Sequence, residues 1–204
     1  MKLYDTLSGS KKEFAPLNET VSMYVCGPNL YGPCHIGHAL SYVFFDVLKR
    51  YLEYQGYKVN HVQNFTDIED RIIEVASSEG KSIEELSQFY IEKFLTEMDA
   101  LGIKRANHYP KATDYIDQMI TIIQNLIGKG DAYEIDGDVY FRVRHFLDYG
   151  KLSRRPIDEM QAGSRIDIDH RKEDPLDFAL WKSSKAGEPS WPTPWGAGRP
   201  GWHI

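Results

Sequence analysis

The sequence is short of cysteine and has no long apolar run. It contains only two cysteines, Cys26 and Cys34, in 204 residues, and their spacing lacks the close pairs of zinc ribbons and redox motifs. So few cysteines exclude a scaffold built on disulfides. No stretch reaches the ~18 consecutive apolar residues that a membrane-spanning helix requires. The first residues lack the apolar core of a signal peptide, so we expect a cytoplasmic protein with no membrane partner.

Positive charge is also in short supply. Lysine and arginine number 24 against 30 aspartates and glutamates, which gives a formal net charge of -6. This balance argues against a protein that coats nucleic acid nonspecifically, although it leaves room for a local basic patch. The hydrophobic content of 42% is typical of a globular chain, and the length suits one domain with an insertion or a small second lobe.

The stretch from Cys26 to His38 carries the most informative pattern. An apolar run, Val21 to Val25, precedes it, and apolar residues at helical spacing follow from Ile36 to Leu52. This order predicts a strand, a glycine-containing turn and a helix. The first turn of a helix has unpartnered N–H groups and a dipole that favours anions. With His35 and His38 three residues apart there, we predict a phosphate-binding site.

The following residues predict alternating strands and helices. The run Tyr57–Phe65 is a second strand candidate, and a strand, a helix and a strand in this order indicate a right-handed parallel unit. A capping-box pattern at Thr66 predicts a helix over 67–79. Ser82 begins another helix that ends at Gly102, and a further helix is expected over 113–129.

The last third of the chain has a different character. Asp136-Gly137 predicts the tight turn of a β-hairpin, because these residues accept positive φ angles. Residues 144–177 are polar and predict a mostly surface segment in which Arg154 and Arg155 are solvated. The proline- and glycine-rich end predicts an ordered loop whose tryptophans pack on the body or line a pocket, namely Trp191, Trp195 and Trp202.

Several segments together resemble one family. His35-Ile-Gly-His38 matches a general class signature, and four longer segments match in the family's order: Met23–Pro28, Asn64–Asp70, Asp174–Lys182 and Gly187–Ile204. They cover nearly the whole chain. The sequence thus resembles the class I aminoacyl-tRNA synthetases and, within them, the cysteinyl-tRNA synthetases.

The resemblance implies a ligase that activates L-cysteine with ATP and magnesium and passes cysteine to tRNA(Cys), acting as a monomer. It also implies a role for eight residues. These are His35 and His38 as catalytic residues that also bind ATP, Tyr31 and Gly37 as further ATP-binding residues, Gly27, Thr66 and Trp202 as substrate-binding residues, and Cys26 as a zinc ligand.

The implied chemistry suits these residue types. The cysteine carboxylate is already a nucleophile, so the site must align it with the α-phosphate and stabilise developing charge, without needing a general base. Zinc would explain the selection of cysteine over serine, because shape alone separates the two poorly and zinc prefers a thiolate.

The fold that the resemblance implies is α/β. Residues 1–130 are expected to form the first half of the nucleotide-binding domain, a Rossmann-like parallel sheet with helices on both faces. Residues 131–204 are expected to form a partly β insertion that returns toward the active site. The family's other zinc ligands, its Lys-Met-Ser-Lys-Ser signature and its anticodon-reading domain are expected beyond Ile204, so we expect this chain alone to be catalytically incomplete.

Some features leave other interpretations open. Asn29, Gly32 and Leu40 stand where family members commonly have Thr, Asp and Arg, so the turn departs from the family pattern. A mycothiol-pathway ligase that joins cysteine to glucosaminyl-inositol shares the cysteine and histidine elements, although Leu152–Gly163 agrees better with the tRNA enzymes. A non-catalytic nucleotide-binding module is the third possibility.

Simpler structural roles also compete for single residues. Thr66 can serve as a helix N-cap alone. Cys34 matches no family role and is interpreted as a structural cysteine.

Overall fold

The computed structural model describes residues 1–157, 159 and 170–204. These fall into two compact units, Ala15–Tyr115 on one side and Met1–Phe14 with Ile116–Ile204 on the other. The predicted division at residue 130 concerned a catalytic domain and its insertion, and it stays a prediction. Among the described residues, no helix is both long and apolar enough to cross a bilayer.

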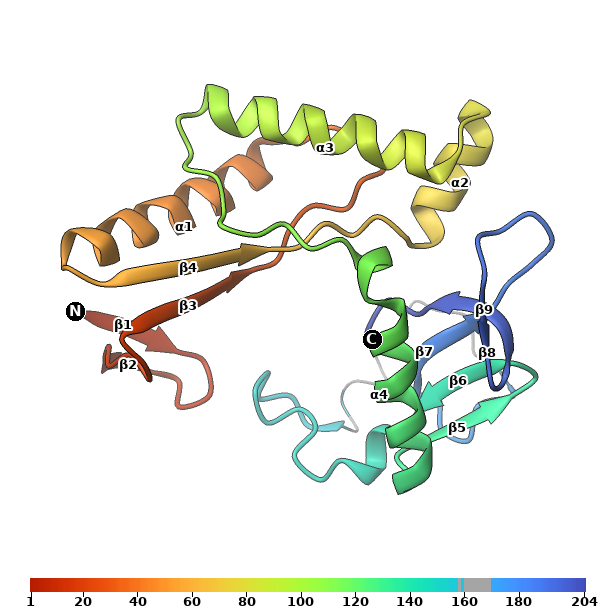
Figure 1. The fold of residues 1–204 in the computed structure, drawn as a ribbon. Helices are drawn as coiled ribbons and strands as arrows, with labels where there is room; N and C mark the ends of the chain where they lie inside the picture. Colours follow the sequence, from red (N-terminus) through yellow and green to blue (C-terminus); the bar gives the residue numbers. More distant parts are fainter. Residues whose placement is uncertain (158, 160–169) are drawn as a thin grey trace. The chain divides into compact units, whose positions relative to one another are not determined.

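The Ala15–Tyr115 unit is built on a parallel strand pair (Figure 1). Strands β3 (Thr20–Val25) and β4 (Lys58–Gln63) are joined through helix α1 (Ile36–Tyr54), and helices α2 (Asp70–Glu79) and α3 (Ile83–Ala100) follow. Thr20 lies opposite Lys58 and Val25 opposite Gln63. Isolated parallel bridges from Val62 to His108 and from Phe65 to Lys111 extend the pairing beyond β4. The predicted parallel strand–helix–strand unit is confirmed, and with it the α/β class.

The core of this unit lies against one face of β3. Val21, Met23 and Val25 are buried, whereas the alternate residues of the strand are exposed. Because side chains alternate across a strand, the helices of this unit pack on a single face of β3. Phe94 of α3 is at the centre of the packing, with its ring edge-on to Tyr42 and Phe65 at centroid separations of 5.3 and 5.6 Å.

Helix α1 is predicted correctly, but most of its apolar stripe is not buried. Leu40 is 73% exposed and Phe44 is 62% exposed. The buried residues of the helix are Tyr42, Lys49 and Leu52. Lys49 is tolerated in this position because its ammonium donates a hydrogen bond to the Arg105 carbonyl at 3.1 Å.

The predicted start of α2 is wrong. The helix begins at Asp70 with Glu69 as its N-cap, and Thr66 does not cap it. The reason lies in the backbone: the Thr66 N–H donates to the Pro28 carbonyl at 3.3 Å, which keeps this segment extended alongside the loop after β3. By contrast, Ser82 caps α3 as predicted, and Glu85 completes the capping box.

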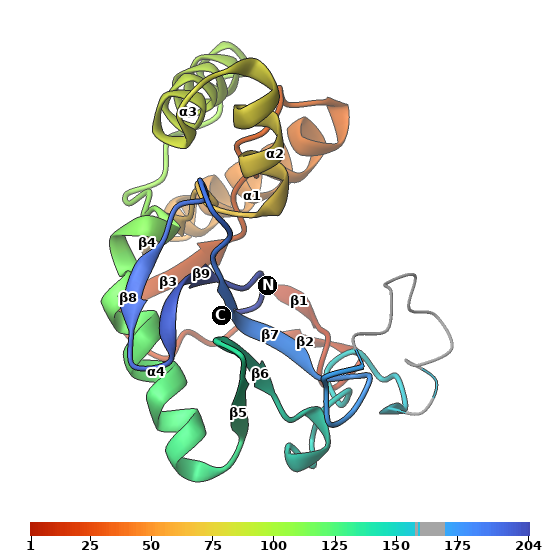
Figure 2. The ribbon, with the colours of Figure 1, turned by 90° about the vertical axis from the view of Figure 1, so that its right-hand side faces the viewer.

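The other unit is a helix on an antiparallel sheet, preceded by the hairpin of β1 (Lys2–Asp5) and β2 (Ser10–Glu13). A 3-10 turn (Ala112–Tyr115) precedes α4 (Ile116–Lys129), so the helix predicted over 113–129 begins three residues later. Figure 2 shows α4 beside the sheet. Its strands, in the order β5-β6-β7-β9-β8, are β5 (Ala132–Ile135), β6 (Asp138–Phe141), β7 (Phe178–Ser183), β9 (Gly196–Pro200) and β8 (Trp191–Thr193).

Two predictions for this unit have different outcomes. The β5–β6 hairpin turns at Asp136 and Gly137 with φ of 54° and 85°, as expected. The segment predicted as a loop instead forms β8 and β9. A Cβ at Gly198 would lie 2.3 Å from the Trp181 indole nitrogen, so glycine lets β9 lie against that ring.

The tryptophans and the polar segment also need correction. Trp191 and Trp195 pack against the core of this unit as expected. Trp202 is 54% exposed, so it is not part of the buried core, and its predicted place on the body or in a pocket stays a prediction. Arg154 and Arg155 are exposed as predicted, but Asp177, at the end of the supposed surface segment, is only 3% exposed. The stretch Leu152–Gly163 includes residues 158 and 160–163, which lie outside the described residues.

Candidate active site at the carboxyl ends of β3 and β4

The loops that follow β3 and β4 lie together, since parallel strands end at the same edge. The Leu30 N–H donates to the Thr66 carbonyl at 3.3 Å, and a parallel bridge joins Asn29 to Thr66. Ligands of open parallel sheets bind at this edge. The two loops and the start of α1 hold all but one of the predicted site residues, which are Cys26, Gly27, Tyr31, His35, Gly37, His38 and Thr66.

The two histidines cap α1 reciprocally. His35 is the N-cap, and its Nδ1 accepts the Gly37 N–H at 3.1 Å. The His38 Nδ1 in turn accepts the His35 N–H at 3.2 Å, so the pair forms a capping box. Their ring centroids are 4.0 Å apart. Sequence reasoning placed both histidines on the first turn but missed that each one satisfies a backbone donor.

The caps fix the tautomer of both rings. A nitrogen that accepts a hydrogen bond carries no proton, so each neutral ring has its proton on Nε2. Burial lowers the pKa of His38, and the nearby charge that His35 carries when protonated lowers it further. At neutral pH, His38 therefore presents a neutral imidazole with an Nε2–H donor at a helix N-terminus, which favours anions.

Gly37 gives the His35 ring its place. A Cβ at Gly37 would lie 2.9 Å from Cε1 and 3.1 Å from Nδ1 of His35. A side chain at residue 37 would crowd the His35 imidazole, so glycine gives this ring room to fold over the backbone. This geometry supports Gly37 as part of the site through the shape of the helix start.

Asn64 ties the loop after β3 to the loop after β4. Its Oδ1 accepts the Gly27 N–H at 2.8 Å and the Tyr24 hydroxyl at 2.9 Å. Its Nδ2 donates to the Thr66 hydroxyl at 3.4 Å. A Cβ at Gly27 would lie 1.5 Å from the backbone carbonyl oxygen of Asn64, so only glycine permits the two backbones to approach this closely. Sequence reasoning did not select Asn64, although it begins one of the matching segments.

Cys26 stands at the end of β3 with an exposed thiol. Its Sγ lies 3.8 Å from the Gly27 carbonyl oxygen. Burial raises the pKa of the neighbouring Tyr24 hydroxyl, and a charge on Cys26 raises it further. A zinc site needs at least three protein ligands. Within the described part of the chain no three His, Cys, Asp or Glu side chains are grouped in this way, so these residues do not fit a zinc site by themselves.

Comparison with known proteins identifies the family. The family model described as the tRNA synthetases class I (C) catalytic domain matches residues 13–204. The chain belongs to this family. Class I synthetases use ATP, which agrees with an anion site at the start of α1.

Curated relatives match the whole chain. It is 54% identical over 205 residues to the cysteine–tRNA ligase of Caldicellulosiruptor saccharolyticus and 53% identical to that of Desulforamulus reducens. These alignments cover 100% of this chain but 44% and 42% of the two relatives. The chain therefore spans less than half the length of the relatives that it matches.

Two solved structures share the fold. A LeuRS of Agrobacterium radiobacter, in a ternary complex with tRNA and LeuAMS, matches 58% of this chain and 16% of its own, with 26% identity and a TM-score of 0.50. The methionyl-tRNA synthetase of Mycobacterium tuberculosis, in complex with methionyl-adenylate, matches 60% of this chain and 25% of its own, with 20% identity and a TM-score of 0.51. The second likeness shows the fold alone.

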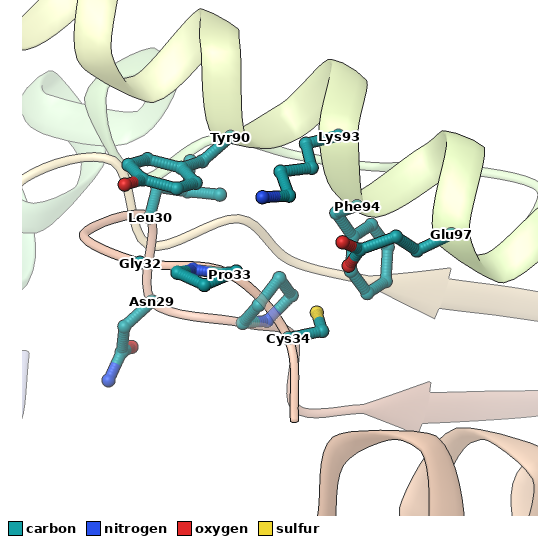
Figure 3. A pocket seen from close by; sticks show the side chains of 10 residues that line it. Asn29, Leu30, Gly32, Pro33, Cys34, Tyr90, Lys93, Phe94 and Glu97 are labelled. Carbon is teal, nitrogen blue, oxygen red and sulfur yellow. The ribbon is translucent and has the colours of Figure 1, made fainter. Parts of the chain in front are cut away.

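Cys34 of this synthetase domain has a structural setting. Figure 3 shows it in a small cavity between the loop Pro28–Cys34 and α3, facing Glu97. Burial raises the pKa of the Cys34 thiol to about 11, and the Glu97 carboxylate adds to the rise. The thiol is protonated at neutral pH and so is a poor nucleophile, which agrees with its interpretation as a structural cysteine. Both cysteines are free of disulfide.

The remaining predicted residues of the synthetase domain are Tyr31 and Trp202. The Arg71 guanidinium lies over the Tyr31 ring, 4.8 Å from its centroid. Trp202 follows β9 and belongs to the other compact unit. The ATP-binding role of Tyr31 and the substrate-binding role of Trp202 stay predictions.

Proposed function

We propose that this chain carries the ATP- and cysteine-binding site of a cysteine–tRNA ligase. The observation that supports it best is the capping box of His35 and His38 at the carboxyl end of a parallel strand pair. This proposal is supported because a helix N-terminus and two histidine side chains lie at the sheet edge where α/β proteins commonly bind ligands. In this proposal β3, α1 and β4 begin a Rossmann-like sheet, on one face of which the helices of this unit pack, and residues 131–204 form its insertion.

The proposed reaction needs positioning and charge stabilisation. The carboxylate oxygen of L-cysteine attacks the α-phosphorus of magnesium-bound ATP, a new P–O bond forms, and the bond to pyrophosphate breaks. No proton has to be removed from the carboxylate. The Nε2–H groups of His35 and His38 donate to phosphate oxygens as charge builds on them, assisted by the α1 dipole. The activated cysteine then passes to tRNA(Cys), as the names of the relatives indicate.

The proposed cysteine pocket is next to the histidines in the same unit. Gly27 and Thr66, linked through Asn64, form its wall beside Cys26. Trp202 belongs to the other compact unit, and its substrate-binding role stays a prediction. Cys26 is proposed as one zinc ligand. We assign no step to zinc, because the described residues group no further ligands with Cys26.

Binding of ATP tests the proposal directly. Calorimetric titration of the 204-residue chain with magnesium ATP should show binding that His38→Ala weakens by about tenfold or more, the size expected for a hydrogen bond to a charged group. His108→Ala is the matched control, because His108 is exposed in the same unit, and it should bind like the parent. A parent chain that binds no ATP would overturn the proposal.

Cysteine-dependent exchange of pyrophosphate into ATP tests the catalytic role. Where the chain exchanges, loss of one preorganised donor should lower the rate by about 10²–10³-fold, so His38→Ala should reduce turnover more than it raises the KM for cysteine. Equal turnover of His38→Ala and the parent would contradict the role of His38. Substitution of L-serine for L-cysteine should abolish exchange.

A further inference from the structure

We propose that Asn64 is a positioning residue that orients the Thr66 hydroxyl as a hydrogen-bond donor toward an acceptor on the bound amino acid. The inference rests on the proposed function, since it takes the amino acid to bind beside Gly27 and Thr66. Asn64 contacts no reacting atom in this proposal, but it determines whether the Thr66 hydroxyl is available to donate a hydrogen bond to the ligand.

The polarity of the contacts follows from one backbone group. The Gly27 N–H can only donate, so the Asn64 atom that it meets at 2.8 Å must be the carbonyl oxygen Oδ1. The Tyr24 hydroxyl donates to the same oxygen at 2.9 Å. The amide nitrogen of Asn64 is thereby turned to the other side of the group.

The consequence falls on Thr66. The Asn64 Nδ2 has only protons to offer, so the Thr66 oxygen, 3.4 Å away, must accept from it. The Thr66 O–H proton is not needed for this contact and can point elsewhere. The Thr66 backbone is held independently by Pro28 and Leu30, so the hydroxyl keeps its place while its proton is directed. A carboxylate oxygen of an amino acid is the acceptor that such a donor fits.

A purely structural role and the proposed positioning role of Asn64 predict different outcomes for Asn64→Asp, whereas Asn64→Ala disrupts both. In Asn64→Asp the side chain can still accept from Gly27 and Tyr24. A carboxylate has no proton to give, however, so the Thr66 hydroxyl turns to donate to it and is lost to the ligand. Asn64→Ala removes all three contacts. A structural tie between the two loops should therefore survive Asn64→Asp. The proposed orientation of the Thr66 hydroxyl by Asn64, called the relay below, should not survive it.

A double-mutant cycle measured by calorimetric titration with L-cysteine tests the inference. Asn64→Asp should weaken cysteine binding by about 10–100-fold, the range for a hydrogen bond to a charged group. Thr66→Val, which keeps the shape and lacks the hydroxyl, should weaken it similarly. Adding Asn64→Asp to Thr66→Val should change little further, because the hydroxyl that Asn64 orients is already gone.

The cycle separates the relay from the added charge. If Asn64→Asp weakens binding equally in the parent and in Thr66→Val, the effect is repulsion between carboxylates and the inference is wrong. If Asn64→Asp binds cysteine like the parent, it is also wrong. If the parent binds no L-cysteine, the proposed function fails and the inference fails with it, which is a different result from a parent that binds without coupling.

A measurement without ligand covers the folding of the variants. The Gly27 amide proton should exchange slowly with solvent in the parent and in Asn64→Asp, and rapidly in Asn64→Ala, when followed by NMR. Fast exchange in Asn64→Asp would mean that the loop tie itself had been lost, and this would overturn the proposed separation of the tie from the relay.

Discussion

Asn64 and Asp138 are each the centre of a polar cluster, and the two clusters differ in what they leave unused. The Asp138 carboxylate accepts from the Ser183 N–H and hydroxyl at 2.7 and 2.9 Å, from the Arg171 guanidinium at 2.8 Å, and from the Tyr140 hydroxyl at 3.1 Å. The residue is 8% exposed. Burial alone would raise the pKa of Asp138, but these hydrogen bonds outweigh it and lower the pKa.

The Asn64 cluster is not saturated in this way. The Thr66 hydroxyl keeps its proton, the Tyr24 oxygen keeps its lone pairs, and the Cys26 thiol beside them is exposed. A buried group that uses its whole hydrogen-bonding capacity contributes to stability and specifies a fold. A group whose partners retain donors at a strand end can serve a ligand. Whether hydrogen-bonding groups are left over therefore distinguishes a stabilising cluster from a ligand-binding cluster more clearly than the types of residue in it.

Removal of the saturated cluster should have the largest effect on stability. Asp138→Ala removes the buried carboxylate that accepts from Arg171 and leaves the Ser183 N–H without this acceptor, and we expect the free energy of unfolding to fall by about 3 kcal/mol. All four tryptophans, Trp181 to Trp202, lie in the same unit as Asp138. Urea unfolding followed by tryptophan fluorescence therefore measures the change where it occurs.

The control for Asp138 is a surface aspartate of the same unit. Asp148 pairs with Lys151 at 3.3 Å with both side chains more than half exposed, so Asp148→Ala should change stability by less than about 0.5 kcal/mol. If Asp138→Ala also cost so little, the distinction between the two clusters would be lost.

Two glycines of the β3–α1 loop give the next largest contrast. Gly27→Ala would force a Cβ to within 1.5 Å of the backbone carbonyl oxygen of Asn64. We expect the free energy of unfolding to fall by about 2 kcal/mol as the two loops separate. Gly32 has open space at its Cβ position, so Gly32→Ala should be nearly neutral. Far-UV circular dichroism during urea unfolding follows α1 to α3 of this unit together with α4 of the other unit. Equal midpoints for the two variants would contradict the close approach at Gly27.

The acid side of the stability curve gives a smaller effect. His61 on β4 is buried, and both of its ring nitrogens lack a hydrogen-bond partner among the described residues. Burial lowers its pKa and the Lys49 charge lowers it further, while Asp46 acts in the opposite direction. The unfolded chain therefore binds the proton more readily, so the free energy of unfolding should fall as the pH drops below about 6.5.

A non-titrating variant isolates this residue. His61→Leu removes the titration without leaving a polar group unpaired, so it should flatten the decline in stability between pH 7.5 and 5.5. His108→Gln, which replaces an exposed histidine of the same unit, should keep the decline. A decline that persists unchanged in His61→Leu would assign it to other groups, such as the histidines at the start of α1.

The succession of helices, strands and turns could be predicted from the sequence better than the roles of single side chains. The β3–α1–β4 unit, the Ser82 cap and the Asp136-Gly137 turn follow from local patterns, so they could be predicted. Thr66 also had a local capping pattern, but hydrogen bonds to residues 36 and 38 positions earlier in the chain held it extended. Strand β9, which pairs with β7, and the burial of Asp177, which bonds to Tyr133 and Val143, likewise depend on partners more distant in sequence.

The site shows the same division. The positions of His35 and His38 on the first helical turn could be predicted from spacing. Their reciprocal capping could not, because imidazole is an unusual cap and its geometry depends on how Gly37 lets the His35 ring fold back. The role of Asn64 depends on two loops that meet only in the folded chain. Residues that act through others have little local signal.

Substitution of Arg71 gives the smallest expected effect on stability. It also tests whether Arg71 and Tyr31 serve ATP binding or only the fold. It is exposed, and its guanidinium lies over the Tyr31 ring and donates to the Tyr31 hydroxyl at a long 3.4 Å. Arg71→Met should lower the free energy of unfolding by less than about 1 kcal/mol, since exposed cation–π contacts contribute little. Arg71→Lys, which keeps the cation, should lower it less. If Tyr31 binds ATP as predicted, Arg71→Met should still weaken ATP binding in calorimetric titration, because the ring loses the contact that holds it. A loss of stability without a loss of ATP affinity would place Arg71 and Tyr31 with Asp138, as parts that hold the fold.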